Sequence, residues 1–288
     1  MNFLHFYHPT PALFSFGPVT IYWYGFLMAL AIIFGALIFY FLTKSLKIKS
    51  SLIIDLLFYV LIFGLLGGRF YHVFSEFNYY WHEPLKIFFL WQGGLGIYGA
   101  MLGGVLAIYF FIKKNQKEIN VFSAACHLSL VTCFFVLLDL LVPSLALGQA
   151  LGRWGNYFNQ EIFGRPTFLS WGIPIDPVNR PASYLNFEFF HPLFLYESLF
   201  CFLLFVFLFF LTRKIYQSAI INKPPGLILT LYLFSYGLWR FFIEFLRLDH
   251  QPVFLTLRLG QWVSIFLIIL AVVVYLHRKK WYNKIITI

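Results

Sequence analysis

The chain contains, at residues 20–42, the uncharged stretch TIYWYGFLMALAIIFGALIFYFL. At about 1.5 Å per helical residue, this stretch is long enough to cross the ~30 Å hydrocarbon core of a bilayer. Similar apolar blocks follow, so the sequence predicts about seven spanning helices, over residues 20–42, 53–75, 94–112, 121–142, 192–212, 226–246 and 260–277. We therefore expect an all-α, polytopic membrane bundle in which residues 1–288 form a single integral membrane domain.

The composition excludes a soluble domain. Of 288 residues, 61% are hydrophobic, 23% aromatic and only 11% charged, and the mean hydropathy is +0.79. A domain in water would have to expose much of this apolar surface. The lipid bilayer is therefore predicted to be the solvent of the chain.

The basic residues predict the orientation, because Lys and Arg in short loops stay on the cytoplasmic side of a membrane. Thirteen of the 21 basic residues fall in alternate predicted loops and in the tail, at Lys44, Lys47, Lys49, Lys113, Lys114, Lys117, Arg213, Lys214, Lys223, Arg278, Lys279, Lys280 and Lys284. With seven crossings, the N-terminus lies outside and the C-terminus in the cytoplasm. The net charge of +10 is then mostly a topology signal, so we expect no nucleic-acid partner.

The other eight basic residues predict an anion site near the outer side. Seven of them are arginines, whose planar guanidinium group suits phosphate or carboxylate; the set is Arg69, Lys86, Arg153, Arg165, Arg180, Arg240, Arg247 and Arg258. Further polar residues lie at the outer starts of spans, at Tyr24, Tyr98, His191, Tyr196 and Glu197. A structural ion pair explains any single intramembrane charge equally well, but the convergence of several favours a site.

The densest polar segment is GQALGRWGNYFNQEIFGR at residues 148–165. Pro143 followed by Ser144 predicts that the helix before it breaks and restarts, because proline interrupts backbone hydrogen bonding and serine can cap a new first turn. In the restarted helix, Gly148, Gly152 and Gly155 would pack closely on a neighbour. Arg153, Asn156 and Gln160 would share the other face. We interpret the segment as a head-group site rather than as a packing motif with a polar end.

Span six carries a polar stripe, since Tyr232, Tyr236, Arg240, Glu244 and Arg247 recur every three or four residues. Glu244 is placed to orient both arginines. Two arginines beside one glutamate leave surplus positive charge for an anion, whereas tyrosines alone would indicate interfacial packing.

The sequence indicates no metal and no cofactor. The eight His residues are scattered without ligand spacing, and the three Cys residues fall in apolar spans. The chain also contains no phosphate-cradling loop, dinucleotide fingerprint or nucleophile elbow.

Several short motifs are spread along most of the chain. The longest is GRWGNYFNQEIFG at residues 152–164, and the others are WYG at 23–25, GGR at 67–69, Gly93-Gly94 with Gly99, HPLFLYE at 191–197 and RFFIEFLR at 240–247. Their order and spacing, from about residue 12 to residue 277, resemble the bacterial prolipoprotein diacylglyceryl transferase family.

The resemblance implies transfer of the diacylglyceryl group of phosphatidylglycerol to the lipobox cysteine thiol of prolipoproteins, forming a thioether and releasing glycerol phosphate. This is the first step of bacterial lipoprotein maturation. The resemblance also implies a multi-pass protein of the bacterial inner membrane, with its active site toward the outer side. Because the departing phosphate gains negative charge, Arg153 and Arg240 are predicted to stabilise it.

The same resemblance assigns further residues. Asn156 and Glu161 would orient the head group or Arg153, Tyr24 would line the site, and Gly164 would allow close backbone approach. The predicted sets are, for catalysis, Arg153, Arg240, Tyr24, Asn156, Glu161, Glu244 and Tyr98, and, for phosphatidylglycerol binding, Arg153, Asn156, Arg240, Gly164 and Arg69.

The sequence leaves open which group activates the thiol. An ordinary thiol has a pKa of ~8.5, so a base or an arginine field must favour the thiolate. The family commonly has His just before Gly99, where this chain has Tyr98. The candidate bases are Tyr98, Glu161, Glu197 and His191.

Two further expectations concern the outer loop and a competing class of protein. The loop over about residues 165–190 is rich in Pro, Asn and aromatic residues, and could guide the signal peptide of the substrate. An anion or lipid transporter, or flippase, would use the same arginines without chemistry. Such folds usually contain repeated halves with access from both faces, and the chain has no convincing repeat, so the sequence favours the transferase.

Overall fold

Seven long helices form the frame of the chain in the computed structural model. The structure describes residues 2–17, 19–44, 46, 48–90, 93–116, 118, 130–216, 223–249 and 251–286, residue 2 and residues 281–286 by their backbone alone. Within these residues seven helices are long and apolar enough to cross a membrane: α2 Trp23–Lys44, α3 Ser50–Ser75, α5 Ile97–Lys114, α7 Leu130–Phe158, α8 Leu193–Tyr216, α9 Leu227–Ile243 with the following 3-10 turn η5 Glu244–Leu246, and α10 Leu259–Ile286. The predicted helical chain of about seven spans is confirmed. Residues 121–129 of predicted span four lie outside the described residues.

Short elements lie between the long helices. They include three antiparallel pairs, β1 Ala12–Phe16 with β2 Val19–Tyr22, β3 Ile173–Pro174 with β4 Phe189–Phe190, and β5 Val253–Phe254 with β6 Leu257–Arg258. The short helices are α1 Asn2–Phe6, α4 Phe77–His82, η1 Pro84–Phe88, η3 Pro177–Asn179 and η4 Ala182–Tyr184.

The chain divides into two compact units. Unit 1 comprises Met1–Phe39, Asp139–Ile215 and Asn222–Ile288, and unit 2 comprises Tyr40–Leu138 and Tyr216–Ile221. Boundaries between them fall inside α2, inside α7 and before the last residue of α8. The single membrane domain expected over residues 1–288 stays a prediction.

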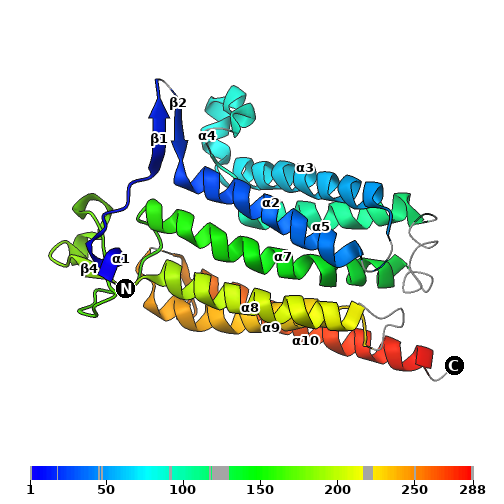
Figure 1. Ribbon diagram of the computed structural model, residues 1–288. Coiled ribbons are helices and arrows are strands. Elements are labelled where there is room, and N and C mark those ends of the chain that lie inside the picture. The colour runs from blue at the N-terminus through cyan, green and yellow to red at the C-terminus, as the bar shows by residue number, and fades with distance from the viewer. Residues whose placement is uncertain are drawn as a thin grey trace. The chain divides into compact units, whose positions relative to one another are not determined.

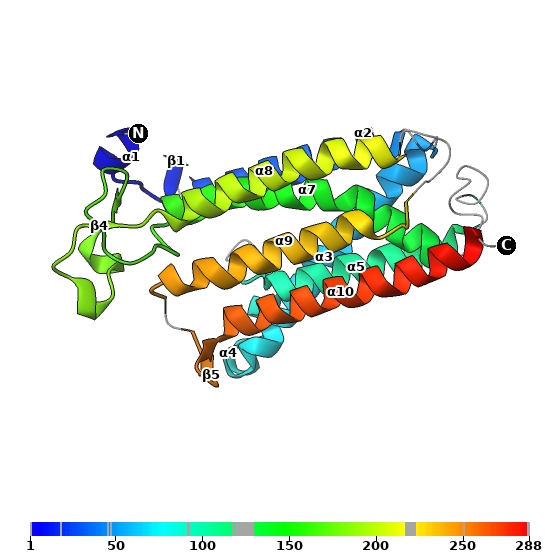
Figure 2. The same ribbon diagram turned by 90° about the horizontal axis from the view of Figure 1, so that it is seen from below.

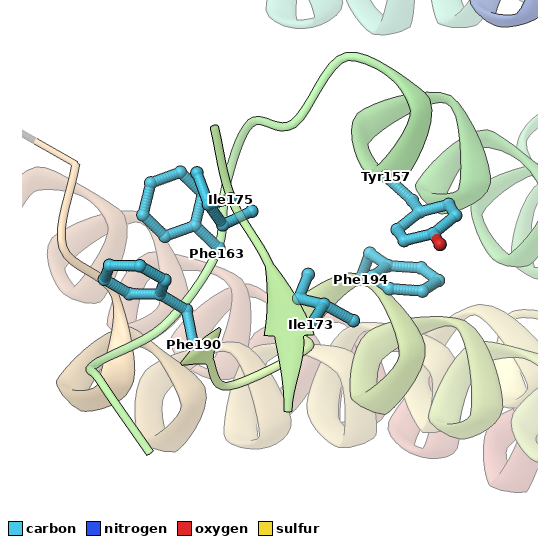
Figure 3. Packing of buried hydrophobic residues seen from close by; sticks show 6 residues of the cluster. All are labelled: Tyr157, Phe163, Ile173, Ile175, Phe190 and Phe194. Atoms are coloured by element: carbon cyan, nitrogen blue, oxygen red, sulfur yellow. The ribbon is translucent and has the colours of Figure 1, made fainter. Parts of the chain in front are cut away.

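An apolar core fixes the end of unit 1 where α7 ends and α8 begins. Figure 3 shows Tyr157 of α7 facing Phe194 of α8, and their ring centroids are 4.5 Å apart. The other buried members come from the loop between these helices and are Phe163, Ile173, Ile175 and Phe190. β3 pairs with β4 in this loop, and His5 of α1 stacks on Phe189 with ring centroids 4.1 Å apart. The predicted outer loop is therefore a small folded cap, gathered with α1 at one end of the helices (Figure 1).

Helix α7 runs without interruption through Pro143, so the predicted break at Pro143 and Ser144 is wrong. A proline costs one backbone hydrogen bond, and packing against neighbouring helices lets membrane helices tolerate that loss. Ser144 is only 5% exposed and lies against Gly35 of α2, where a Cβ atom on the glycine would be 3.7 Å from the serine Cβ atom. Tertiary packing has thus overridden a local helix-breaking signal.

A buried carboxylate sets the start of α9. The side chain of Asp139 on α7 is 1% exposed and accepts hydrogen bonds from the backbone N–H groups of Gly226 and Leu229, each at 2.8 Å. The first N–H groups of a helix have no partner within the helix, and a carboxylate is favoured at that end of the helix dipole. From this start, α9 runs alongside α10 in both views (Figures 1 and 2).

Glycines bring α3 and α5 of unit 2 unusually close. A Cβ atom built on Gly67 or on Gly99 would collide with the carbonyl oxygen of the other, and one on Gly103 would collide with the carbonyl oxygen of Phe63. Close backbone approach between membrane helices depends on such small residues. Gly104 has space for a side chain, because a Cβ atom built on it would meet only the Cγ1 atom of Val60, at 3.7 Å.

The Gly99→Ala variant is expected to lose thermal stability, because overpacking of a tight contact costs about 1–3 kcal/mol and the colliding atom is rigid backbone. Gly104→Ala, five residues further along α5, is the matched control and should melt like the wild type. Thermal unfolding of both variants in detergent micelles measures the difference. Equal melting temperatures would show that the contact between α3 and α5 is looser than described.

Candidate active site

A chain of buried ion pairs joins α7, α8 and α9 in unit 1. Glu197, on the second turn of α8 and 1% exposed, lies between two arginines. Its Oε2 atom is 2.5 Å from Nη2 of Arg153 on α7, and its Oε1 atom is 2.9 Å from Nη1 of Arg240 on α9. The other terminal nitrogen of Arg240, Nη2, is 2.7 Å from Oε2 of Glu244. Two guanidinium groups are thus held in one layer by carboxylates that are almost fully buried.

The series of ion pairs continues from Glu244 to two more arginines. Glu244 is fully buried, and its oxygens lie 3.8 Å from Nη1 of Arg247 and 3.9 Å from Nη1 of Arg258. Arg247 in turn holds Asp249 through two hydrogen bonds of 2.7 and 2.6 Å. Burial of Asp249 opposes its ionisation, but these bonds and one from Gln251 outweigh that effect and hold its pKa below the usual range.

The carboxylates of Glu197 and Glu244 have oxygen atoms that could accept further hydrogen bonds. Oε2 of Glu197 and both oxygens of Glu244 are buried and accept no well-directed hydrogen bond from the described residues, although arginines lie within ion-pair distance. Buried charges are expensive to desolvate unless they are paired and fully hydrogen-bonded. The arrangement is therefore held by charge rather than by complete hydrogen bonding.

A second branch leads from Arg153 to Glu161. Nη1 of Arg153 donates to Oδ1 of Asn156 at 3.2 Å, and Nδ2 of Asn156 donates to Oε1 of Glu161 at 2.8 Å. Tyr24, at the start of α2, lies against Gly155, where a Cβ atom would meet the Cδ2 atom of the tyrosine at 2.5 Å. The predicted close packing at the glycines of α7 is confirmed at this position.

Gly164 joins the cap to the start of α8. Its N–H group donates to the carbonyl oxygen of His191 at 2.9 Å, and a Cβ atom on it would lie 2.8 Å from the His191 Cβ atom. The Nδ1 atom of His191 is 3.2 Å from the hydroxyl of Tyr196, which accepts a hydrogen bond from Nε1 of Trp171 at 2.9 Å. Partial burial lowers the pKa of His191, so its imidazole is uncharged at neutral pH and adds no positive charge to the site.

The polar residues next to Arg153, on the side away from the cap, are uncharged. The hydroxyl of Tyr232 donates to Oε1 of Gln149 at 2.9 Å, and the thiol of Cys201 lies 3.9 Å from the same oxygen. Gln149 and Arg153 are four residues apart on α7, so they occupy the same helix face one turn apart. The positive charge of the site is therefore concentrated at one end of the helices.

Two predicted site residues belong to unit 2. Arg69, on α3 and 7% exposed, donates from Nε to the carbonyl oxygen of Ile87 at 2.8 Å and from Nη1 to those of Gly93 and Gly94 at 2.7 and 3.0 Å. Arg69 also donates to the carbonyl oxygen of Lys86 and lies over the ring of Tyr80, 5.2 Å from its centroid. Its guanidinium group therefore binds the turn that leads into α5.

Tyr98 lies on the first turn of α5, is 47% exposed and contacts the ring of Tyr71 at 5.9 Å between centroids. The structure thus groups Arg153, Arg240, Glu244, Asn156 and Glu161 in one connected network, with Tyr24 and Gly164 on adjacent backbone of unit 1. Arg69 and Tyr98 form their contacts within unit 2.

Glu197 has a larger part in the site than the sequence predicted, where it was one of the polar residues near the outer side and a candidate base. The structure places Glu197 between the two arginines chosen for phosphate binding. A usable signal was present, because Glu197 is the only Asp or Glu in predicted span five and unpaired carboxylates are rare in membrane helices. The sequence did not indicate the role of Asp139 at the start of α9, because its partners Gly226 and Leu229 are far from it in sequence.

Among the residues that the structure describes, no group of three or more His, Cys, Asp or Glu is arranged to hold a metal ion. That the protein needs no metal and no cofactor stays a prediction. The chemistry available in the described site is that of arginines, carboxylates, amides and tyrosines. These groups bind and polarise a phosphate and transfer protons.

Seven apolar spans and a buried layer of paired arginines and glutamates define an integral membrane protein with an ion-pair network inside its helices. A family model for prolipoprotein diacylglyceryl transferase matches residues 11–277. The chain belongs to the prolipoprotein diacylglyceryl transferase family, as the motifs predicted. The prediction of a membrane transferase in lipoprotein biosynthesis is confirmed with it.

Similar proteins cover nearly the whole chain. A phosphatidylglycerol--prolipoprotein diacylglyceryl transferase of Parasynechococcus marenigrum is 42% identical over 244 residues, covering 85% of this chain and 82% of the relative. The protein of the same name from Synechococcus elongatus is 40% identical over 264 residues, covering 91% and 85%. That of Nostoc sp. is 38% identical over 263 residues, covering 90% and 86%.

Proposed function

We infer that this chain transfers the diacylglyceryl group of phosphatidylglycerol to the cysteine thiol of a prolipoprotein lipobox. The observation that carries the inference is the pairing of Arg153 and Arg240 through Glu197, in a chain of this family. One phosphate between two guanidinium groups is a recurrent recognition geometry, because each group offers two parallel donors. Glu197 contacts both guanidinium groups and so keeps them near each other before substrate binds.

At the glyceryl carbon, the reaction forms a carbon–sulfur bond and breaks a carbon–oxygen bond. The sulfur attacks the glyceryl carbon that carries the phosphate, the carbon–oxygen bond breaks, and glycerol phosphate leaves with the bonding electrons. The thiol proton passes to a base and the phosphate gains negative charge. Arg153 and Arg240, already oriented by carboxylates before substrate binds, stabilise that charge without reorganisation.

The remaining predicted residues have supporting roles in this proposal. Glu244 orients Arg240, Asn156 orients Arg153, and Tyr24 and Gly164 shape the site beside them. We keep Arg69 and Tyr98 as proposed contributors from unit 2, to phosphatidylglycerol binding and to catalysis respectively. The hydrogen bonds from Arg69 to the carbonyl oxygens of Gly93 and Gly94 support a role in which Arg69 positions this turn.

We place the site toward the outer side of a bacterial inner membrane, with the N-terminus outside and the C-terminus in the cytoplasm. In α8, Glu197 lies near the start, while Arg213 and Lys214 lie in the last turn. Basic residues favour the cytoplasmic side, so the opposite helix end, with the ion-pair layer, faces outward. The cap over residues 165–190 is then positioned to meet the signal peptide of a prolipoprotein.

The purified protein, incubated in detergent with phosphatidylglycerol and a lipobox peptide, should add the mass of one diacylglyceryl group to the peptide. Diacylglycerol in place of phosphatidylglycerol should give no product, because its hydroxyl is a poor leaving group without phosphate. The peptide mass measures both arms. An unmodified peptide with phosphatidylglycerol, under conditions where another member of the family is active, would contradict the proposed function.

A further inference from the structure

Glu161 is held by donors that leave half of its carboxylate unused. Asn156 and Asn159 both donate from Nδ2 to its Oε1 atom, at 2.8 and 3.3 Å. Arg153 donates to the Oδ1 atom of Asn156, which fixes the amide so that its N–H group points to Glu161. No residue in the described ranges donates to Oε2 of Glu161, and the residue is exposed at the end of α7.

The backbone around Glu161 is strained on both sides. Gln160 and Ile162 have φ angles of 52° and 55°, in the left-handed region that residues other than glycine rarely adopt. Each such residue costs on the order of 1–3 kcal/mol and persists only where its surroundings over-determine it. Strain of this kind gathers at functional sites, so the turn marks Glu161 as a residue whose position matters.

Gln160 supplies the contacts that hold this turn. Its Nε2 atom donates to the carbonyl oxygen of Pro9 at 2.9 Å and to Oδ2 of Asp176 at 2.6 Å, and its Oε1 atom accepts from the N–H group of Asp176 at 2.7 Å. Gln160 is 5% exposed. The N-terminal segment and the cap thus fix the residue before Glu161 from two sides.

Other candidate bases near the arginines are already engaged. Both oxygens of Glu197 face guanidinium groups, so a proton there would weaken two buried ion pairs at once. His191 directs Nδ1 to Tyr196, and no hydrogen bond links its ring to the network of Arg153 within the described residues. Glu161 is an exposed residue connected to Arg153, and its Oε2 atom accepts no hydrogen bond from the part of the chain that the structure describes.

We propose that Glu161 is the general base that takes the proton from the prolipoprotein thiol. The sulfur–hydrogen bond breaks, the proton moves to Oε2 of Glu161, and the electron pair on sulfur forms the new bond to carbon while the phosphate leaves. The proton then passes from Glu161 to water or to the released phosphate. This step rests on the proposed transferase function and assigns a role that the sequence left open among four residues.

The test compares pH profiles of the wild type, Glu161→Gln and Glu188→Gln in the peptide assay. Glu188 is an exposed carboxylate of the cap over residues 165–190, and its variant is the matched control. Loss of a general base should lower kcat of Glu161→Gln by about 10²- to 10⁴-fold at pH 7, with KM for phosphatidylglycerol unchanged. The deficit should shrink as pH rises toward the thiol pKa of ~8.5, because the thiol then ionises without help.

A second readout replaces the lipobox cysteine with selenocysteine, whose selenol is already ionised at neutral pH. Glu161→Gln should act on this peptide at close to the wild-type rate, and Glu161→Asp, which keeps a carboxylate, should retain activity on the ordinary peptide. A loss by the same factor at every pH and with both peptides, in a variant that melts like the wild type, would overturn the proposal. Unimpaired Glu161→Gln activity would also overturn it. An inactive wild type would instead refute the transferase function itself.

Discussion

Replacement of Arg153 with lysine is expected to lower kcat by about 10²- to 10³-fold, the usual effect of removing one preorganised donor to a developing negative charge. Lysine keeps the charge but is a single flexible donor group. It cannot hold Glu197 and Asn156 together, as the guanidinium group does at 2.5 and 3.2 Å, and still face a phosphate. Because the loss occurs mainly in the transition state, KM for phosphatidylglycerol should change much less.

Steady-state kinetics of peptide lipidation measure this prediction. Arg213→Lys is the matched control, since Arg213 lies in the last turn of α8, about 24 Å along the helix from Glu197. That variant should keep wild-type kinetics. If Arg153→Lys retained full kcat, the guanidinium geometry at this position would be irrelevant to the reaction.

The second large effect is expected at Glu197. Its removal in Glu197→Ala leaves two buried guanidinium groups without their shared partner, which costs about 3–5 kcal/mol of stability for a buried pair. Glu197→Gln keeps the volume but presents an amide N–H group toward an arginine. Both variants should lower kcat by about 10²-fold or more, since displacement of a catalytic group by ~1 Å suffices for such a loss.

Thermal unfolding and kinetics together separate the two contributions at Glu197. Glu197→Ala should melt well below the wild type, whereas Glu197→Gln should melt closer to it and still be slow. The neighbouring Ser198 provides the control, because its hydroxyl donates to the carbonyl oxygen of Ala150 on α7 and accepts from Nε1 of Trp154, and within the described residues it forms no hydrogen bond with either arginine. Ser198→Ala should keep its kcat. A fast Glu197→Gln enzyme would show that the shared carboxylate is dispensable for positioning.

The spans could be predicted from sequence because lipid imposes one requirement on every crossing, a long apolar helix with its backbone satisfied internally. Local signals failed where packing decided the outcome. Pro143 predicts a break, but α7 continues through it, with Ser144 buried against α2. The folded cap rests on pairs far apart in sequence, such as Ile173 with Phe190, and no local pattern specifies their register.

The site was predictable where its partners share a helix. Arg240 and Glu244 are four residues apart, so helical periodicity alone brings them together, and the structure joins them at 2.7 Å. Glu197 meets Arg153 and Arg240 only through the packing of three helices. The Arg69 environment was also out of reach, because backbone carbonyl groups carry no sequence signal. Arginine in a span therefore predicts a partner without revealing whether that partner is substrate or backbone.

The most direct test of the account follows the oxygen that links the diacylglyceryl carbon to phosphorus. Phosphatidylglycerol carrying a heavy oxygen isotope at that position is incubated with the purified protein and a lipobox peptide, and both products are weighed by mass spectrometry. Attack at carbon, with Arg153 and Arg240 on the leaving phosphate, predicts that all of the label leaves in glycerol phosphate, in an amount equal to the lipidated peptide. Label that stays with the lipid, or bound phosphatidylglycerol that yields neither product, would contradict the account.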